Sequence, residues 1–211
     1  NDYKYLPDLA AAPSTVDNGG VKVPGDNGDA MTVTWKLKDG LQWSDGHPLT
    51  CDDFAYTWSW VMDPQNTGLA GGTTGYDEIT KVDCPDPTTI VYHFKDVYES
   101  YLTIGTPLPK HYLSSIPMAD QVKGKGFQPA DMPNVPVSGA FKFQSVTSGQ
   151  ELRLVRNDNY KGFKSGQPAL LDTLIWHWYG DADAMIAGFA AGEVDFATDL
   201  QDSDIPKLEQ Q

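Results

Sequence analysis

Residues 31–63 predict a strand, a pair of turns and a helix in direct succession, and no other stretch constrains the fold as tightly. Within residues 32–37 apolar side chains alternate with polar ones, which is the pattern of a strand with one buried face. Two Asp-Gly dipeptides then mark turns within residues 39–46. Thr50 and Asp53 have the spacing of a capping box, so we expect a helix that begins at Thr50 and continues to the end of this stretch. The cap alone should contribute about 1 kcal/mol.

The rest of the chain also contains strand and helix patterns. Further strands are predicted at residues 79–83, 88–94, 151–156 and 170–178. The strand at 170–178 is mostly apolar, so we expect it to be buried. We expect Asp181 to cap a helix that Gly192 ends. Residues 66–76 predict a glycine-rich surface loop, and residues 118–134 predict a loop or linker.

Charge and hydropathy limit the partners of this chain. Its 211 residues include 29 acidic and 15 basic ones, which gives a formal charge of −14. Nucleic acid and anionic membrane surfaces would repel such a chain, so we expect neither as a partner. The sequence has no apolar run of about 18 residues and no signal peptide. We therefore expect a soluble chain that, if exported, is already processed.

Two cysteines, Cys51 and Cys84, lie 33 positions apart. In an exported protein we expect them to form a disulfide, which would contribute about 3 to 4 kcal/mol in the chain-entropy model. The alternative is a pair of small buried thiols. Two cysteines are too few for a disulfide-stapled miniprotein or a four-cysteine zinc site.

Sequence motifs for catalysis, phosphate binding and metal binding are missing. Neither G-x-x-x-x-G-K-[ST], G-x-G-x-x-G, H-E-x-x-H nor G-x-S-x-G occurs. The chain has four histidines, and we expect each to be structural or on the surface: His47, His93, His111 and His177. Asp26 and Asp29 lie close together in the sequence but lack the ligand spacing of a calcium loop. We therefore predict no catalytic residue, no metal site and no cofactor.

The block at 31–63 resembles the front part of the family 5 extracellular solute-binding proteins of ABC transporters, the oligopeptide, dipeptide and nickel binding proteins. Its TVTWKLKDGLQW strand and SDGHPLT turn carry the resemblance. The similarity continues in order from about residue 5 to residue 200, through GEVDF at 192–196, which resembles the strand that enters the hinge. It implies a mixed α/β (α+β) fold, an incomplete periplasmic-binding-protein-like class II lobe with a mixed sheet and flanking helices.

The resemblance also implies how the chain is organised. Members of the family are about twice this length or more and close two lobes on a ligand. We expect residues 1–200 to be a partial first lobe, with one subdomain at about 31–127 and a sheet returning to the hinge at about 128–200. Residues 201–211 would start the hinge or second lobe.

The implied function is the capture of peptides or a similar small solute for an ABC importer. The expected partners are that ligand and the membrane permease, with the chain a monomer in the periplasm or at the extracellular face of the membrane. Any other membrane association would need a lipid anchor that this chain lacks. The resemblance implies ligand contacts at Tyr76, Ser138, Gly139 and Phe141.

Alternatives are open at this point. The Tyr76 ring could instead pin its loop to the core. Six Trp and ten Tyr residues in an acidic chain would also suit a secreted carbohydrate-binding module. A hydrolase has only unpaired carboxylates to support it, since Asp181, Asp183 and Asp195 are explained as a helix cap, a helix surface and a turn.

Overall fold

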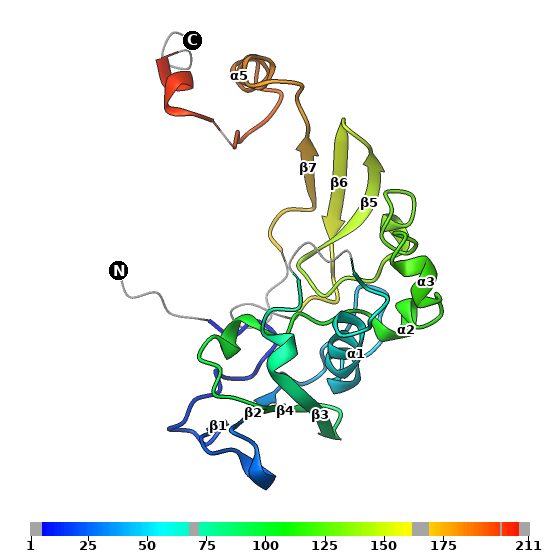
Figure 1. Cartoon of the computed structure of the whole chain (residues 1–211). Coiled ribbons are helices and arrows are strands. Elements are labelled where there is room, and N and C mark those ends of the chain that lie inside the picture. The colour runs from blue at the N-terminus through cyan, green and yellow to red at the C-terminus, as the bar shows by residue number, and fades with distance from the viewer. Residues whose placement is uncertain (1–5, 68–71, 162–168, 199, 207–211) are drawn as a thin grey trace.

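The computed structural model describes residues 6–67, 72–161, 169–198 and 200–206. Residue 5, where the resemblance begins, and part of the glycine-rich loop predicted at 66–76 lie outside these ranges. Two sheets, with strand orders β1-β2-β4-β3 and β5-β6-β7, organise the described part of the chain. In Figure 1 the first sheet lies near α1, while the second sheet leads away from it toward α5. The predicted mixed α/β class is confirmed, and every strand pairing in the described ranges is antiparallel.

The first sheet contains both strands of the predicted hairpin. β2 (Met31–Lys36) lies between β1 (Val21–Lys22) and β4 (Thr89–Phe94), and β3 (Ile79–Asp86) pairs with the other side of β4. The strand predicted at 32–37 and the hairpin predicted within 79–94 are therefore confirmed.

The first half of β2 departs from simple alternation. Thr32 lies on the strand face expected to be exposed, yet its side chain is buried, with only 1% exposed. The loop that contains the 3-10 helix η1 (Asp26–Gly28) covers it, and the Asp26 backbone N–H donates to the Thr32 hydroxyl at 2.9 Å. The expectation of one exposed polar face is wrong at Thr32, because this loop packs over the strand.

Helix α1 (Cys51–Val61) follows Thr50, as the capping-box spacing predicts. The Thr50 backbone N–H donates to the Asp53 carboxylate at 2.9 Å. The helix packs its apolar side on the first sheet, and the buried cluster between them includes Val33, Trp43, Phe54, Ile79, Ile90 and Phe94. Each large apolar side chain buried there contributes about 1.5 to 3 kcal/mol.

A disulfide joins Cys51, the first residue of α1, to Cys84 of β3. Its loop spans 33 positions, so the chain-entropy model gives a stabilisation of about 3 to 4 kcal/mol. The bridge ties the helix to the edge strand of the first sheet.

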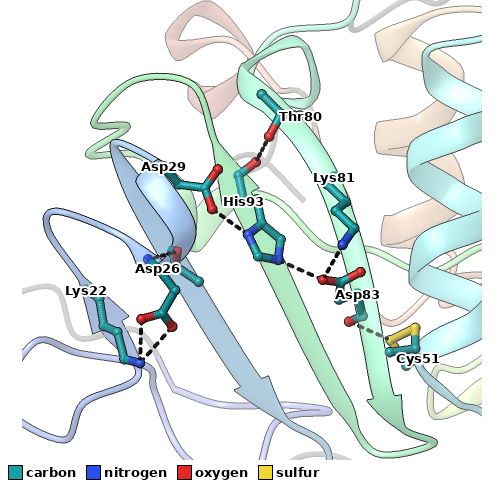
Figure 2. Close-up of polar contacts among 10 residues, drawn as sticks. Lys22, Asp26, Asp29, Cys51, Thr80, Lys81, Asp83 and His93 are labelled. Atoms are coloured by element: carbon teal, nitrogen blue, oxygen red, sulfur yellow. Dashed lines mark hydrogen bonds and ion pairs between the residues drawn. A yellow bond between two sulfur atoms is a disulfide. The ribbon is translucent and has the colours of Figure 1, made fainter.

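His93 of β4 links that edge strand to the loop before β2, as Figure 2 shows. Its Nδ1 lies 2.6 Å from Asp29 Oδ2 and its Nε2 lies 3.1 Å from Asp83 Oδ2. Lys81 Nζ also contacts Asp83, at 2.8 Å. The His93 residue is only 7% exposed. Two carboxylates hold the ring from both sides, so the structure gives His93 the structural role that the sequence predicts.

The second sheet consists of β5 (Phe141–Thr147), β6 (Glu151–Arg156) and β7 (Thr173–His177). All five residues of β7 are exposed, including Trp176 at 46%. A strand is therefore confirmed within the predicted range 170–178, but the prediction that it is buried is wrong. The strand is mostly apolar, as the sequence shows, but in the described ranges β7 pairs only with β6 and no element covers its side chains.

Asp181 caps α5 (Ala182–Ala190), as predicted, and its carboxylate accepts from the Ala184 backbone N–H at 2.8 Å. Gly192 follows with a φ of +73°, a conformation that suits glycine and ends the helix. Residues 192–196 form turns rather than the strand implied by the resemblance. In the described ranges they pair with no other strand, which a strand requires.

Short helical turns lie in the segments that connect or follow the longer helices and strands. The segment 118–134, predicted as a loop, contains α3 (Met118–Gln121) and a 3-10 turn, η4 (Met132–Asn134). That prediction is wrong in part, since Gly and Pro interrupt helices without preventing single turns. The other short elements are η2 (Tyr76–Glu78), η3 (Tyr101–Thr103), α2 (Lys110–Leu113) and η5 (Asp202–Asp204). Among helices in the described ranges, none combines the length and apolar character needed to cross a bilayer.

Hydrogen bonds from backbone and side-chain groups join the turn that precedes α1 to the segments that flank β5 and β6. The Ser44 N–H donates to the Val137 carbonyl at 2.9 Å, and the Val137 N–H donates to the Ser44 hydroxyl at 3.1 Å. Asn159 donates to the carbonyls of Trp43 and Ser44 at 3.3 Å each. The turn therefore holds the start of the second sheet against the first.

Candidate functional site

A pocket of about 320 Å³ opens beside the first sheet, and it is the candidate ligand site. Residues 6–13 form one wall, β2 and β4 form the floor, and residues 102–107 form the opposite wall. The segment 6–13 is held to β2 by a bridge between Ala10 and Leu37. This volume lies at the lower end of the range for small-molecule sites, about 300 to 1,000 Å³.

Most of the lining is apolar. It includes Leu9, Trp35, Leu37, Phe54, Ile90 and Ile104. Asp8 supplies the single carboxylate among the described lining residues, and its Oδ1 accepts from the Tyr160 hydroxyl at 2.8 Å. Thr103, Thr106 and Ser138 add polar groups. Because most of this lining is apolar and the rest offers a few polar groups, the arrangement suits the binding of an apolar or uncharged ligand group.

The wall at 102–107 is positioned by α1. The Leu108 backbone N–H donates to the Thr57 hydroxyl at 2.7 Å. Two residues further on, the Lys110 backbone N–H donates to the Asp53 carboxylate at 3.1 Å. Both acceptors are buried, so the wall is fixed to the helix by bonds that water does not easily replace.

Tyr92 of β4 lines the pocket, whereas Tyr76 lies outside the lining and contacts Gly105 of this wall. Burial raises the pKa of the Tyr76 hydroxyl, and a hydrogen bond with the Gly105 backbone opposes that shift. Burial also raises the pKa of Tyr92, and the nearby Tyr76 raises it further. Both phenols are therefore neutral at physiological pH and act as apolar surface with one polar tip.

The structure separates the four residues proposed to contact ligand. Ser138 lines the pocket. Tyr76 packs against the core cluster and touches Gly105 of the wall, but it is not among the lining residues. Gly139 and Phe141 lie at the junction with the second sheet, where the Gly139 carbonyl accepts from Asn157 at 2.8 Å. Of these four residues, Ser138 alone is among the residues that line the pocket.

Two features of this region escaped the sequence analysis. The wall at 6–13 could not be predicted, because those residues show no strand or helix periodicity. The structure also brings together Asp45, His47 and His111, which the sequence presents as scattered. Asp45 and His47 are two positions apart, but His111 lies 66 positions after Asp45, so no local signal links it to them.

Comparison with known proteins gives the family. The family model described as bacterial extracellular solute-binding proteins, family 5 Middle, matches residues 4–211. The oligopeptide-binding protein AppA of Bacillus subtilis is 31% identical over 176 residues, a match that covers 81% of this chain and 30% of AppA. The periplasmic oligopeptide-binding protein OppA of Salmonella typhimurium is 26% identical, over 67% of this chain and 28% of OppA.

Solved structures agree with these matches. The structure of Bacillus subtilis AppA in complex with a nonapeptide superposes with a TM-score of 0.76 at 26% identity, covering 99% of this chain and 40% of that one. The ABC transporter substrate-binding protein CtaP of Listeria monocytogenes gives a TM-score of 0.74 at 25% identity, covering 97% and 38%.

The chain thus spans about 30% to 40% of the length of the relatives it matches. The names of these relatives describe them as solute-binding or oligopeptide-binding proteins. On the match of residues 4–211, and on the shared fold, the chain belongs to the bacterial extracellular solute-binding proteins of family 5.

Proposed function

We propose that this chain is part of a peptide-binding receptor of an ABC importer, and that it supplies one wall of the ligand cleft. The observation that carries the proposal is the match along 99% of the chain to AppA, a protein solved with a nonapeptide bound. The apolar pocket beside β2 and β4 supports it, since it offers binding surface without catalytic groups.

In the proposed mechanism no bond is broken. The receptor captures a peptide outside the cytoplasmic membrane, and the ligand favours a closed arrangement because it binds that arrangement more tightly than the open one. The closed form then docks on a permease. Ligand, permease and extracellular or periplasmic location are all parts of this proposal.

We propose that residues 1–200 belong to the first lobe, with subdomains at about 31–127 and 128–200, and that residues 201–211 lead toward the hinge. The two sheets support this division, because the first ends with β4 and the second begins with β5. The exposed apolar side chains of β7 and its surroundings also suit a longer protein, in which further chain would cover them.

We propose Ser138 as a ligand-facing position and Tyr76 as a support of the wall at 102–107, with Gly139 and Phe141 shaping the turn beside Ser138. A bulky side chain at Ser138 should fill the pocket. In the longer protein, Ser138→Trp should weaken peptide binding at least tenfold, which is about 1.4 kcal/mol. Calorimetric titration with a mixed pool of short peptides measures this loss.

Ser145→Trp is the matched control, because Ser145 lies exposed on β5 outside the pocket. It should bind peptide as the unsubstituted protein does. Equal affinities for both variants, with unchanged melting temperatures, would remove Ser138 from the ligand site. Absence of peptide binding by the longer unsubstituted protein would refute the proposed function itself.

A further inference from the structure

Asp45, His47 and His111 form a compact group at the surface, on the turn before α1 and on α2. One ligand atom from each residue lies within 4.8 Å of the other two. His111 Nε2 is 2.8 Å from Asp45 Oδ2, and His47 Nδ1 is 3.6 Å from the same oxygen. None of the three is among the residues that line the pocket.

The turn that carries two of these residues has a fixed shape. Asp45 Oδ1 accepts from the His47 backbone N–H at 3.1 Å, while Asp45 Oδ2 faces the histidine rings. The Gly46 N–H donates to the Trp43 carbonyl at 2.9 Å, and Gly46 has a φ of +88° that suits glycine. The backbone therefore sets the direction of both Asp45 and His47.

The third residue reaches the turn from a distant part of the chain. His111 lies 66 positions after Asp45 and belongs to α2 (Lys110–Leu113). Its ring stacks on that of His47, with centroids 4.2 Å apart and planes inclined by 8°. The Lys110 backbone bond to the buried Asp53 anchors the start of α2, so His111 too is held in place.

We propose that Asp45, His47 and His111 bind a first-row divalent cation of the Zn²⁺ class. Two imidazoles and one carboxylate are typical ligands for Zn²⁺, which leaves one position of a tetrahedral site for water. At metal–ligand distances of about 2.0 to 2.2 Å, tetrahedral ligand atoms lie about 3.3 Å apart. The observed separations bracket this value, so small rotations of exposed side chains complete the site.

Access supports the proposal. The three side chains are 38%, 60% and 24% exposed for Asp45, His47 and His111, so a cation can reach them from solvent. A bound cation would cross-link the turn to α2.

The experiment is a calorimetric titration of the metal-free 211-residue chain with Zn²⁺, together with melting curves. We expect one Zn²⁺ per chain and an increase in Tm of about 5 to 10 °C when free Zn²⁺ is about 100 times its Kd. His47→Ala should weaken binding at least tenfold, since even the loss of an outer partner of a metal site costs 10- to 100-fold.

Asp45→Asn is a second variant, because its amide oxygen can still accept from the His47 N–H and preserve the turn. It should also weaken binding at least tenfold, with the metal-free Tm near that of the unsubstituted chain. His177→Ala removes a histidine on β7 outside the group and should bind Zn²⁺ normally. The proposal is overturned if the unsubstituted chain binds no Zn²⁺ or if both variants bind it as tightly as His177→Ala does.

Discussion

Asp53 is the residue whose replacement tests the fold most severely. Its side chain is buried, with 4% of the residue exposed, and it accepts three hydrogen bonds. Oδ2 receives the Trp43 indole N–H at 3.2 Å and the Thr50 backbone N–H at 2.9 Å, and Oδ1 receives the Lys110 backbone N–H at 3.1 Å. One carboxylate therefore joins the turn, the start of α1 and the start of α2.

Asp53→Ala should lower the free energy of unfolding by about 3 to 5 kcal/mol. A hydrogen bond to a charged group contributes about 1.5 to 3 kcal/mol, and each buried donor left without an acceptor costs about 1 to 3 kcal/mol. These values do not simply add, because the Thr50 N–H at the helix end can find water. For a chain of this size the loss corresponds to a decrease in Tm of about 6 to 20 °C.

Urea denaturation followed by tryptophan fluorescence measures this change, because Trp43 is itself a donor to Asp53. Asp52→Ala is the matched control, since the neighbouring carboxylate is 64% exposed and pairs only at the surface with Lys110 Nζ, at 3.0 Å. It should cost about 1 kcal/mol or less. The loss in free energy of unfolding for Asp53→Asn should lie between those of Asp53→Ala and Asp52→Ala. The reasoning is refuted if Asp53→Ala is no more destabilising than Asp52→Ala.

Two further predictions concern the first sheet. His93→Leu should lower the free energy of unfolding by about 2 to 4 kcal/mol, because it removes the bridge between two carboxylates. The control Lys22→Ala breaks only the half-exposed pair with Asp26 and should cost about 1 kcal/mol or less. Urea unfolding curves that coincide for the two variants would contradict this prediction. Hydrogen bonds, chiefly from Thr89 and Thr88, hold the pKa of Asp86 well below its usual value. The Asp86 carboxylate therefore contributes to the stability of the folded chain above the unfolded-state pKa of about 3.9, and this contribution is lost as the pH falls below that value. Asp86→Asn should therefore reduce the loss of stability below about pH 4, which urea unfolding between pH 2 and pH 7 measures. If the loss of stability below pH 4 is the same in the variant, Asp86 does not contribute to it.

The elements that the sequence predicts well are those with local signals. The strand, turns and capped helix within 31–63 depend on alternation, Asp-Gly pairs and the spacing of Thr50 and Asp53, all of which act within a few residues. The same holds for the hairpin within 79–94 and for Asp181 as a helix cap. The family resemblance added the fold class, which periodicity alone did not give.

The failures depend on contacts between distant segments. Thr32 is buried by a loop that covers its strand, and β7 is exposed although its composition suits a core. The pocket needs residues 6–13 beside β2, and the Asp45–His47–His111 group needs α2 beside the turn. Such pairings follow from the tertiary fold, so no window of sequence contains them.

Native mass spectrometry of the product purified from its source organism is the most direct test of the proposed receptor. If this chain is one wall of a larger peptide-binding cleft, the intact protein should weigh at least twice 23.1 kDa and should release peptide on unfolding. A product of 23.1 kDa that carries no ligand would contradict the proposal.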